Sequence, residues 1–184
     1  MSYRPAIASM SLGRAWVHDL PPKFTAAATA GLPAIEIFFE DLLYLARSLP
    51  GGATPSNQLL AAHKIRALAD SLNLEIMGIG PFANVEGLLC PIAKAEKLVE
   101  LELWFSIARV LGTDVIQIPS TFQTEAFTGD LDAIVKDLRA IADIGACQNP
   151  PFRFAYENLC FGTYNSTWES AWAVVKGVDR ANFG

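Results

Sequence analysis

The 184-residue chain has few of the residues that mark secreted, zinc-binding or nucleic-acid-binding proteins. Its three cysteines, Cys90, Cys147 and Cys160, are odd in number and widely spaced, which fits neither a disulfide framework nor a zinc knuckle. Lysine and arginine form no run, and the formal net charge is -5, which disfavours contact with nucleic-acid phosphates. We therefore expect reduced thiols in a cytoplasmic protein without a nucleic-acid partner.

Long apolar stretches are also missing. No segment reaches the roughly 18–20 apolar residues of a membrane helix, and the short apolar stretch ending near Leu12 lacks the longer apolar region of a signal peptide. The 52% of hydrophobic and 18% of charged residues nevertheless indicate a globular chain with a sizeable core. We expect one domain, residues 1–184, without a membrane partner.

Short β-rich runs alternate with longer helical stretches. The expected strands are Ala6–Met10, Ala34–Phe39, Glu75–Ile79, Asp114–Pro119 and Arg153–Glu157. The expected helices are Pro22–Ala30, Gln58–Leu72, Ala93–Leu111, Asp130–Ile144 and Thr167–Lys176. This alternation predicts parallel strands joined by right-handed crossovers. Trp168 and Trp172 fall on one side of the last helix, and we expect them, with Trp104, to lie in the core.

Alternating βα units fit either an open doubly wound sheet or a barrel. The first strand is not followed by Gly-x-Gly-x-x-Gly, and no Walker-type Gly-Lys-Ser/Thr occurs, which disfavours a nucleotide-binding open sheet. A complete barrel needs about 250 residues. We therefore expect an α/β fold, an incomplete (β/α)8 TIM-type barrel of about five βα units, truncated after the fifth. Its unpaired strand edges would favour self-association.

The carboxyl ends of barrel strands carry the active site, and Glu157 is the sharpest candidate there. Alternate strand residues face opposite sides, so Glu157 is expected to face the barrel interior, away from Phe152, Phe154 and Tyr156. A carboxylate in that place is costly to bury unless it is paired or metal-bound. Carboxylate oxygens suit Mg²⁺ or Mn²⁺. The alternative is a glutamate in a loop or an ion pair.

Two further polar residues interrupt apolar strands. Glu36 alternates with Ile35 and Ile37 and is expected to face inward, either toward a substrate or in an internal ion pair. Gln117 is a candidate to hydrogen-bond a polar substrate, with a satisfied core amide as the alternative. Of the two histidines, His63 falls within a predicted helix. His18 follows the first strand, where it could touch the site, but we expect a solvent-exposed loop residue.

Motifs spread in order along the whole chain carry a family resemblance. They are Ile7–Arg14, Ala34–Leu42, Glu86–Leu88, Leu103–Phe105, Leu111–Ser120, Tyr156–Glu157, Gly162–Thr163, Thr167–Glu169 and Val178–Gly184. These segments resemble the fungal 3-dehydroshikimate dehydratases, a branch of the xylose isomerase-like TIM barrel superfamily. The segment Val178–Gly184 looks like the lead-in to a sixth strand.

The resemblance implies a lyase that converts 3-dehydroshikimate to protocatechuate in quinate and shikimate breakdown. In this family a divalent metal, Mg or Mn, stabilises the enolate formed when a proton next to the ketone is removed. Glu157 matches the first metal ligand, and the next ligand, an aspartate, would follow Gly184. The matched segments also offer Ser11, Arg14, Glu36 and Gln117 as substrate-binding residues. We expect this chain alone to bind metal weakly.

One departure from the family pattern concerns the acid–base group. The family commonly carries Gly-x-His after the glutamate strand, whereas this chain has Gly162-Thr163-Tyr164. Tyr164 is thus the candidate catalytic residue, and a phenol is a poor base at neutral pH. Two alternatives stay open, because fold does not fix function. One is a sugar or inosose isomerase, epimerase or dehydratase of the same superfamily, and the other is a non-enzymatic gene fragment.

Overall fold

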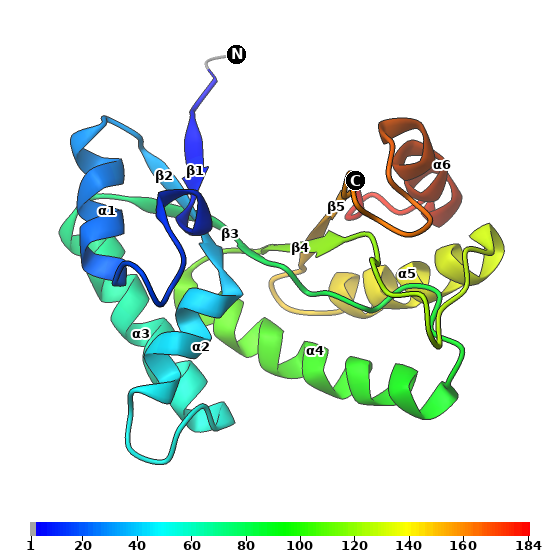
Figure 1. Ribbon diagram of the computed structural model, residues 1–184, viewed down its shortest axis with the longest axis horizontal. Coiled ribbons are helices and arrows are strands. Elements are labelled where there is room, and N and C mark those ends of the chain that lie inside the picture. Colours follow the sequence, from blue (N-terminus) through cyan, green and yellow to red (C-terminus); the bar gives the residue numbers. More distant parts are fainter. Residues whose placement is uncertain (1–2) are drawn as a thin grey trace. The chain divides into compact units, whose positions relative to one another are not determined.

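The computed structural model describes residues 3–184, which form two compact units (Figure 1). The first unit is Met1–Gly80 with Leu103–Thr113, and the second is Pro81–Glu102 with Asp114–Gly184. Each unit contains parallel strands followed by helices, the pattern of an α/β fold.

The first unit holds three strands. In chain order its elements are β1 (Ala6–Ala8), the 3-10 helix η1 (Ser9–Leu12), α1 (Leu20–Thr29), β2 (Ala34–Phe38), α2 (Phe39–Arg47), α3 (Pro55–Ser71) and β3 (Glu75–Gly80). Strand β2 pairs in parallel with both β1 and β3. The α3 helix starts with an N-cap at Thr54, whose side chain accepts a hydrogen bond from Asn57 N.

The second unit holds two strands. Its elements are β4 (Val115–Pro119), α5 (Leu131–Ala146), β5 (Arg153–Glu157) and α6 (Trp168–Val178), and α4 (Pro91–Leu111) begins in it. Strands β4 and β5 are parallel. The last residues run alongside β5, because Phe154 N donates to Asn182 O at 2.8 Å and Tyr156 N donates to Gly184 O at 2.7 Å. This parallel contact agrees with the sixth-strand character predicted for Val178–Gly184.

All five predicted strands and all five predicted helices are present, with ends shifted by a few residues. The first strand is shorter than predicted because Ser9 already belongs to η1. Helix α2 was not predicted; it starts directly after β2 without a side-chain hydrogen bond at its N-cap, Phe38. A helix without a capping residue gives little start signal in the sequence.

The core contains less tryptophan than predicted. Trp104 is buried, but Trp168 and Trp172 are 68% and 56% exposed. Helix α6 instead buries Ala171, Val174 and Val178, so its inward face is the one with the smaller side chains. Cys90, Cys147 and Cys160 are unpaired thiols, as predicted, and all are exposed. Within residues 3–184, none of the helices has the length and apolar character needed to cross a bilayer.

A buried ion pair joins the helices of the first unit. Lys23 Nζ of α1 donates to Asp41 Oδ1 of α2 at 2.6 Å, and the two side chains are 1% and 3% exposed. Ser9 Oγ donates to the other carboxylate oxygen at 2.6 Å and accepts from Phe38 N at 2.9 Å. The cluster therefore fixes η1 and α1 against the end of β2.

A tight contact in the second unit yields a first prediction. A Cβ atom added at Gly145 of α5 would lie 2.4 Å from Cε2 of Phe154 in β5. Gly145→Ala is expected to lower the free energy of unfolding by about 1–3 kcal/mol, the usual range for an overpacked core. Urea denaturation measures this loss. In a Phe154→Leu background the ring atoms are absent, and a loss of the same size there would contradict the proposed clash.

Candidate functional site

The candidate site lies at the carboxyl ends of β4 and β5, within the second unit. Gln117 is paired with Ala155, and Pro119 with Glu157, so the Gln117 and Glu157 side chains share one face. Gln117 Nε2 donates to Glu157 Oε2 at 2.6 Å. Glu157 is exposed, whereas Phe154 on the opposite face is buried beside Gly145 of α5. This is the alternation that the sequence predicts.

The loops that follow the two strands are tied to each other. Ser120 N donates to Glu157 O at 2.8 Å, and Leu159 N donates to Ser120 Oγ at 2.9 Å. Thr163 N donates to Thr121 O at 2.9 Å. The chain directions beyond Gln117 and Glu157 are therefore fixed by two hydrogen bonds between main-chain groups and one to the Ser120 hydroxyl.

Tyr164 lies in the loop after β5. Its hydroxyl donates to Phe127 O at 3.2 Å, and the side chain is partly exposed. The ring packs against Gly129, where an added Cβ would lie 2.4 Å from Cδ1. Tyr164 thus bridges the β5–α6 loop to the β4–α5 loop.

A buried carboxylate lies next to this site. It was not among the site residues predicted from the sequence. Glu86 is fully buried, accepts from Thr121 N at 2.9 Å and accepts from Tyr156 Oη at 2.6 Å. Burial raises the pKa of the Glu86 carboxyl, while the Tyr156 and Thr121 hydrogen bonds act in the opposite direction. Burial and the neighbouring Glu86 raise the pKa of Tyr156. The sequence signal that could have marked Glu86 is a carboxylate within the otherwise apolar run Val85–Leu89.

The other candidate residues belong to the first unit. Ser11 is exposed in η1. Arg14 Nη2 donates to Glu40 Oε2 at 2.7 Å, and the guanidinium lies 4.6 Å from the ring centre of Trp16, so an ion pair and a cation–π contact already hold it. Glu36 is half-buried between the fully buried Ile35 and Ile37. Of the predicted site residues, the structure brings Gln117 and Glu157 into direct contact.

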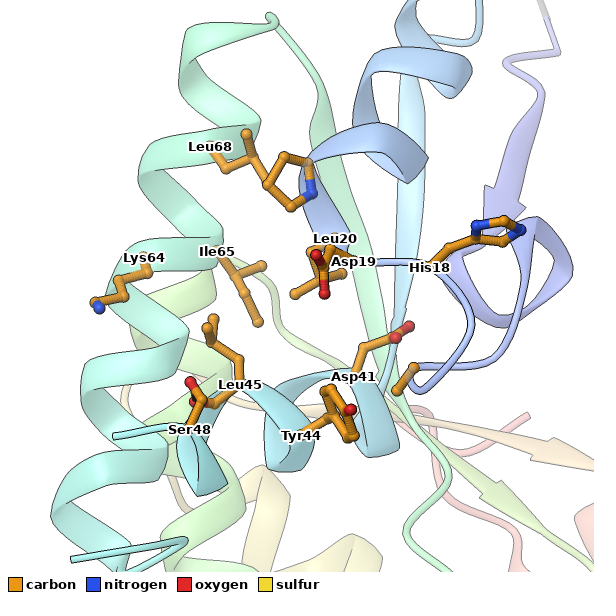
Figure 2. Close-up of a pocket in the computed structure, with 12 residues that line it drawn as sticks. His18, Asp19, Leu20, Asp41, Tyr44, Leu45, Ser48, Lys64, Ile65 and Leu68 are labelled. Atoms are coloured by element: carbon orange, nitrogen blue, oxygen red, sulfur yellow. Dashed lines mark hydrogen bonds between the residues drawn. The ribbon is translucent and has the colours of Figure 1, made fainter. Parts of the chain in front are cut away.

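The first unit also contains a cavity of about 400 Å³. Figure 2 shows His18 at one edge and Lys64 at another, with apolar side chains between them. The apolar part of the lining includes Leu20, Leu45, Ile65 and Leu68. His18 therefore borders a mostly apolar hollow among α1, α2 and α3, and none of the predicted site residues lines it.

The described residues do not complete a metal site by themselves. Nowhere in residues 3–184 do three His, Cys, Asp or Glu side chains gather closely enough to hold an ion. Glu157 and Gln117 offer one carboxylate and one amide oxygen, whereas the octahedral site of an ion such as Mg²⁺ takes about six ligands. The pair supplies at most part of a ligand set.

Comparison with known proteins gives consistent matches along the whole chain. A family model described as xylose isomerase-like TIM barrel matches residues 24–184. The chain is 41% identical over 192 residues to a 3-dehydroshikimate dehydratase of Neurospora crassa, covering 100% of this chain and 54% of that protein. The chain thus spans about half the length of this relative.

Solved structures show the same fold. A xylose isomerase-like TIM barrel/4-hydroxyphenylpyruvate dioxygenase fusion protein matches with a TM-score of 0.81 and 28% identity, covering 100% of this chain and 26% of that one. An IolI protein solved with a zinc atom matches with a TM-score of 0.74 and 14% identity, covering 99% of this chain and 61% of that one. The second likeness shows the fold alone.

Proposed function

Because the chain belongs to the xylose isomerase-like TIM barrel family, we propose that it is the β1-to-β5 part of a lyase that dehydrates 3-dehydroshikimate to protocatechuate. The observation that carries this proposal is the 41% identity to the Neurospora crassa dehydratase across the whole chain. The family match spans both compact units, which supports their belonging to one barrel domain.

The proposed roles follow from the chemistry of each side chain. Glu157 contributes one carboxylate to a divalent Mg or Mn site whose remaining ligands lie outside these residues. Gln117 orients that carboxylate through the 2.6 Å hydrogen bond and offers its amide to a substrate hydroxyl. Ser11, Arg14 and Glu36 follow or belong to β1 and β2 and serve as the polar groups that bind the small-molecule substrate.

The dehydration removes a proton next to the ketone and releases the neighbouring hydroxyl as water, so it requires a base and an acid. A phenol normally keeps its proton at neutral pH. Tyr164 therefore suits the acid better than the base, and as an acid it would donate its proton to the departing hydroxyl. This donation would require the Tyr164 hydroxyl to leave Phe127 O, its present acceptor.

A chain swap tests the proposal. Residues 1–184 replace the matching segment of the Neurospora crassa dehydratase, and protocatechuate is followed by its absorbance with 3-dehydroshikimate and Mn²⁺. We expect turnover by the swapped enzyme and none by the 184-residue chain alone, because Glu157 and Gln117 are too few ligands for a divalent cation. A folded, metal-loaded swap without turnover would refute the substrate assignment. Turnover by the chain alone would refute the assignment of the remaining ligands.

A further inference from the structure

Three buried polar residues of the second unit form one hydrogen-bonded network with Tyr156. They are Glu86, Thr121 and Asn165. Glu86 lies between β3 and α4, Thr121 between β4 and α5, and Asn165 between β5 and α6. The network therefore joins three loops that each follow the carboxyl end of a strand.

The bonds run from the buried carboxylate outward to both strands of the candidate site. Glu86 accepts from Thr121 N, two residues beyond the end of β4, and from Tyr156 Oη, the residue before Glu157. Asn165 Nδ2 donates to Tyr156 Oη at 3.1 Å. One carboxylate thus holds the strand end that carries Gln117 and the strand end that carries Glu157.

The chemical groups of the network indicate that it fixes the position of the two strand ends and does not mainly stabilise the fold. Burying a carboxyl group is costly unless hydrogen bonds offset the lost hydration. The groups that Glu86 accepts from, a backbone N–H and a phenol, are neutral. Apolar side chains would fill the same volume at lower cost, but they could not define the direction of both strand ends.

We infer that Glu86 is the positioning residue of the candidate site. Through Thr121 and Tyr156 it sets the separation of β4 and β5 at their carboxyl ends, and so maintains the 2.6 Å bond between Gln117 and Glu157. This inference rests on the proposed function, which makes Gln117 and Glu157 the groups that need a fixed position.

The test uses nuclear magnetic resonance of the full chain and two variants. In Glu86→Gln one carboxylate oxygen becomes an NH₂ group that cannot accept, so one of the bonds from Thr121 N and Tyr156 Oη must be lost or reversed. Tyr156→Phe keeps the ring and the Glu86–Thr121 bond but removes the phenol that links Glu86 to β5. The matched control is Glu169→Gln, the same chemical change at an exposed position of α6.

The readout is the side-chain amide signal of Gln117, which a bond to a carboxylate displaces from the position of a solvated glutamine. We expect this displacement to be lost in Glu86→Gln and in Tyr156→Phe, and to persist in Glu169→Gln. If Glu86→Gln does not fold, Tyr156→Phe decides alone. An unchanged Gln117 signal in a folded Tyr156→Phe variant would overturn the inference. Since no turnover is measured, an inactive chain swap would overturn the proposed function without affecting this result.

Discussion

Replacing Lys23 with alanine is expected to lower the free energy of unfolding by about 3–5 kcal/mol, the usual effect of breaking a buried ion pair. Total stabilities of natural domains are only about 5–15 kcal/mol, so this single change should remove a large share of the total. Urea denaturation followed by circular dichroism measures the loss.

The reason lies in the Asp41 carboxylate, which is 3% exposed. Without the Lys23 ammonium it keeps the hydrogen bond from Ser9 but has lost its cation. Asp41 also lines the cavity of the first unit, but water in that cavity would not supply the positive charge of the lost ammonium. The truncated side chain also leaves a cavity, which adds to the cost.

Two control variants separate the effect of an unpaired buried charge from a general loss of stability on substitution. Arg4 pairs with Glu75 at the surface, where the side chains are 58% and 53% exposed, and Arg4→Ala should change stability by no more than about 1 kcal/mol. Lys23→Met combined with Asp41→Leu removes both charges and retains volume, so it should be much less harmful than Lys23→Ala alone. If the double variant is as unstable as the single one, packing and not charge is responsible.

The five strands were predictable because each is a short β-rich run between longer helical stretches. The same reasoning missed α2 and read Phe39 as strand, since the apolar residues Ile37, Phe38 and Phe39 continue without a break into the helix. The acidic first turn, Glu40 and Asp41, with Arg47 in the last turn, was the signal that favoured a helix. The strand prediction followed the apolar residues and not this charge pattern.

The buried face of the last helix, α6, shows a second limit of prediction from the sequence. Trp168 and Trp172 are large and apolar, and they lie one turn apart, which resembles a buried stripe. The structure buries Ala171, Val174 and Val178 instead, and Gly177 packs against Val135 of α5. Helix α6 therefore packs against α5 through small residues. Which face of α6 is buried depends on its neighbour α5, so the α6 sequence alone does not predict it.

For the candidate site, the sequence predicted which way a strand side chain points but not which residues it contacts. Strand parity predicted the inward direction of Glu157, whereas Gln117 was predicted only as a substrate-binding residue or a core amide. The bond between them joins residues 40 positions apart, and Glu86 meets Tyr156 across 70 positions. Such pairings depend on how strands and loops pack, so the local pattern around Glu86 could mark a buried carboxylate but not its partners.

Glu157→Gln in the swapped Neurospora crassa enzyme is expected to reduce kcat/KM by on the order of 10²–10³-fold, the range measured when one essential electrostatic group is removed from an active site. The glutamine keeps the size of the side chain and can still accept a hydrogen bond from Gln117, so the fold should be retained. What it loses is the negative charge that would draw a divalent cation to the end of β5.

Metal dependence separates this explanation from simple misfolding. In Glu157→Gln the Mn²⁺ concentration needed for half-maximal activity should rise, and saturating Mn²⁺ should restore part of the activity, because a neutral amide oxygen is a weaker ligand than a carboxylate. Glu169→Gln in α6 serves again as the matched control and should behave as the unmodified swap, since this side chain is exposed and lies outside the site. Full activity of Glu157→Gln at limiting Mn²⁺ would show that the Glu157 carboxylate neither binds the metal nor takes part in catalysis.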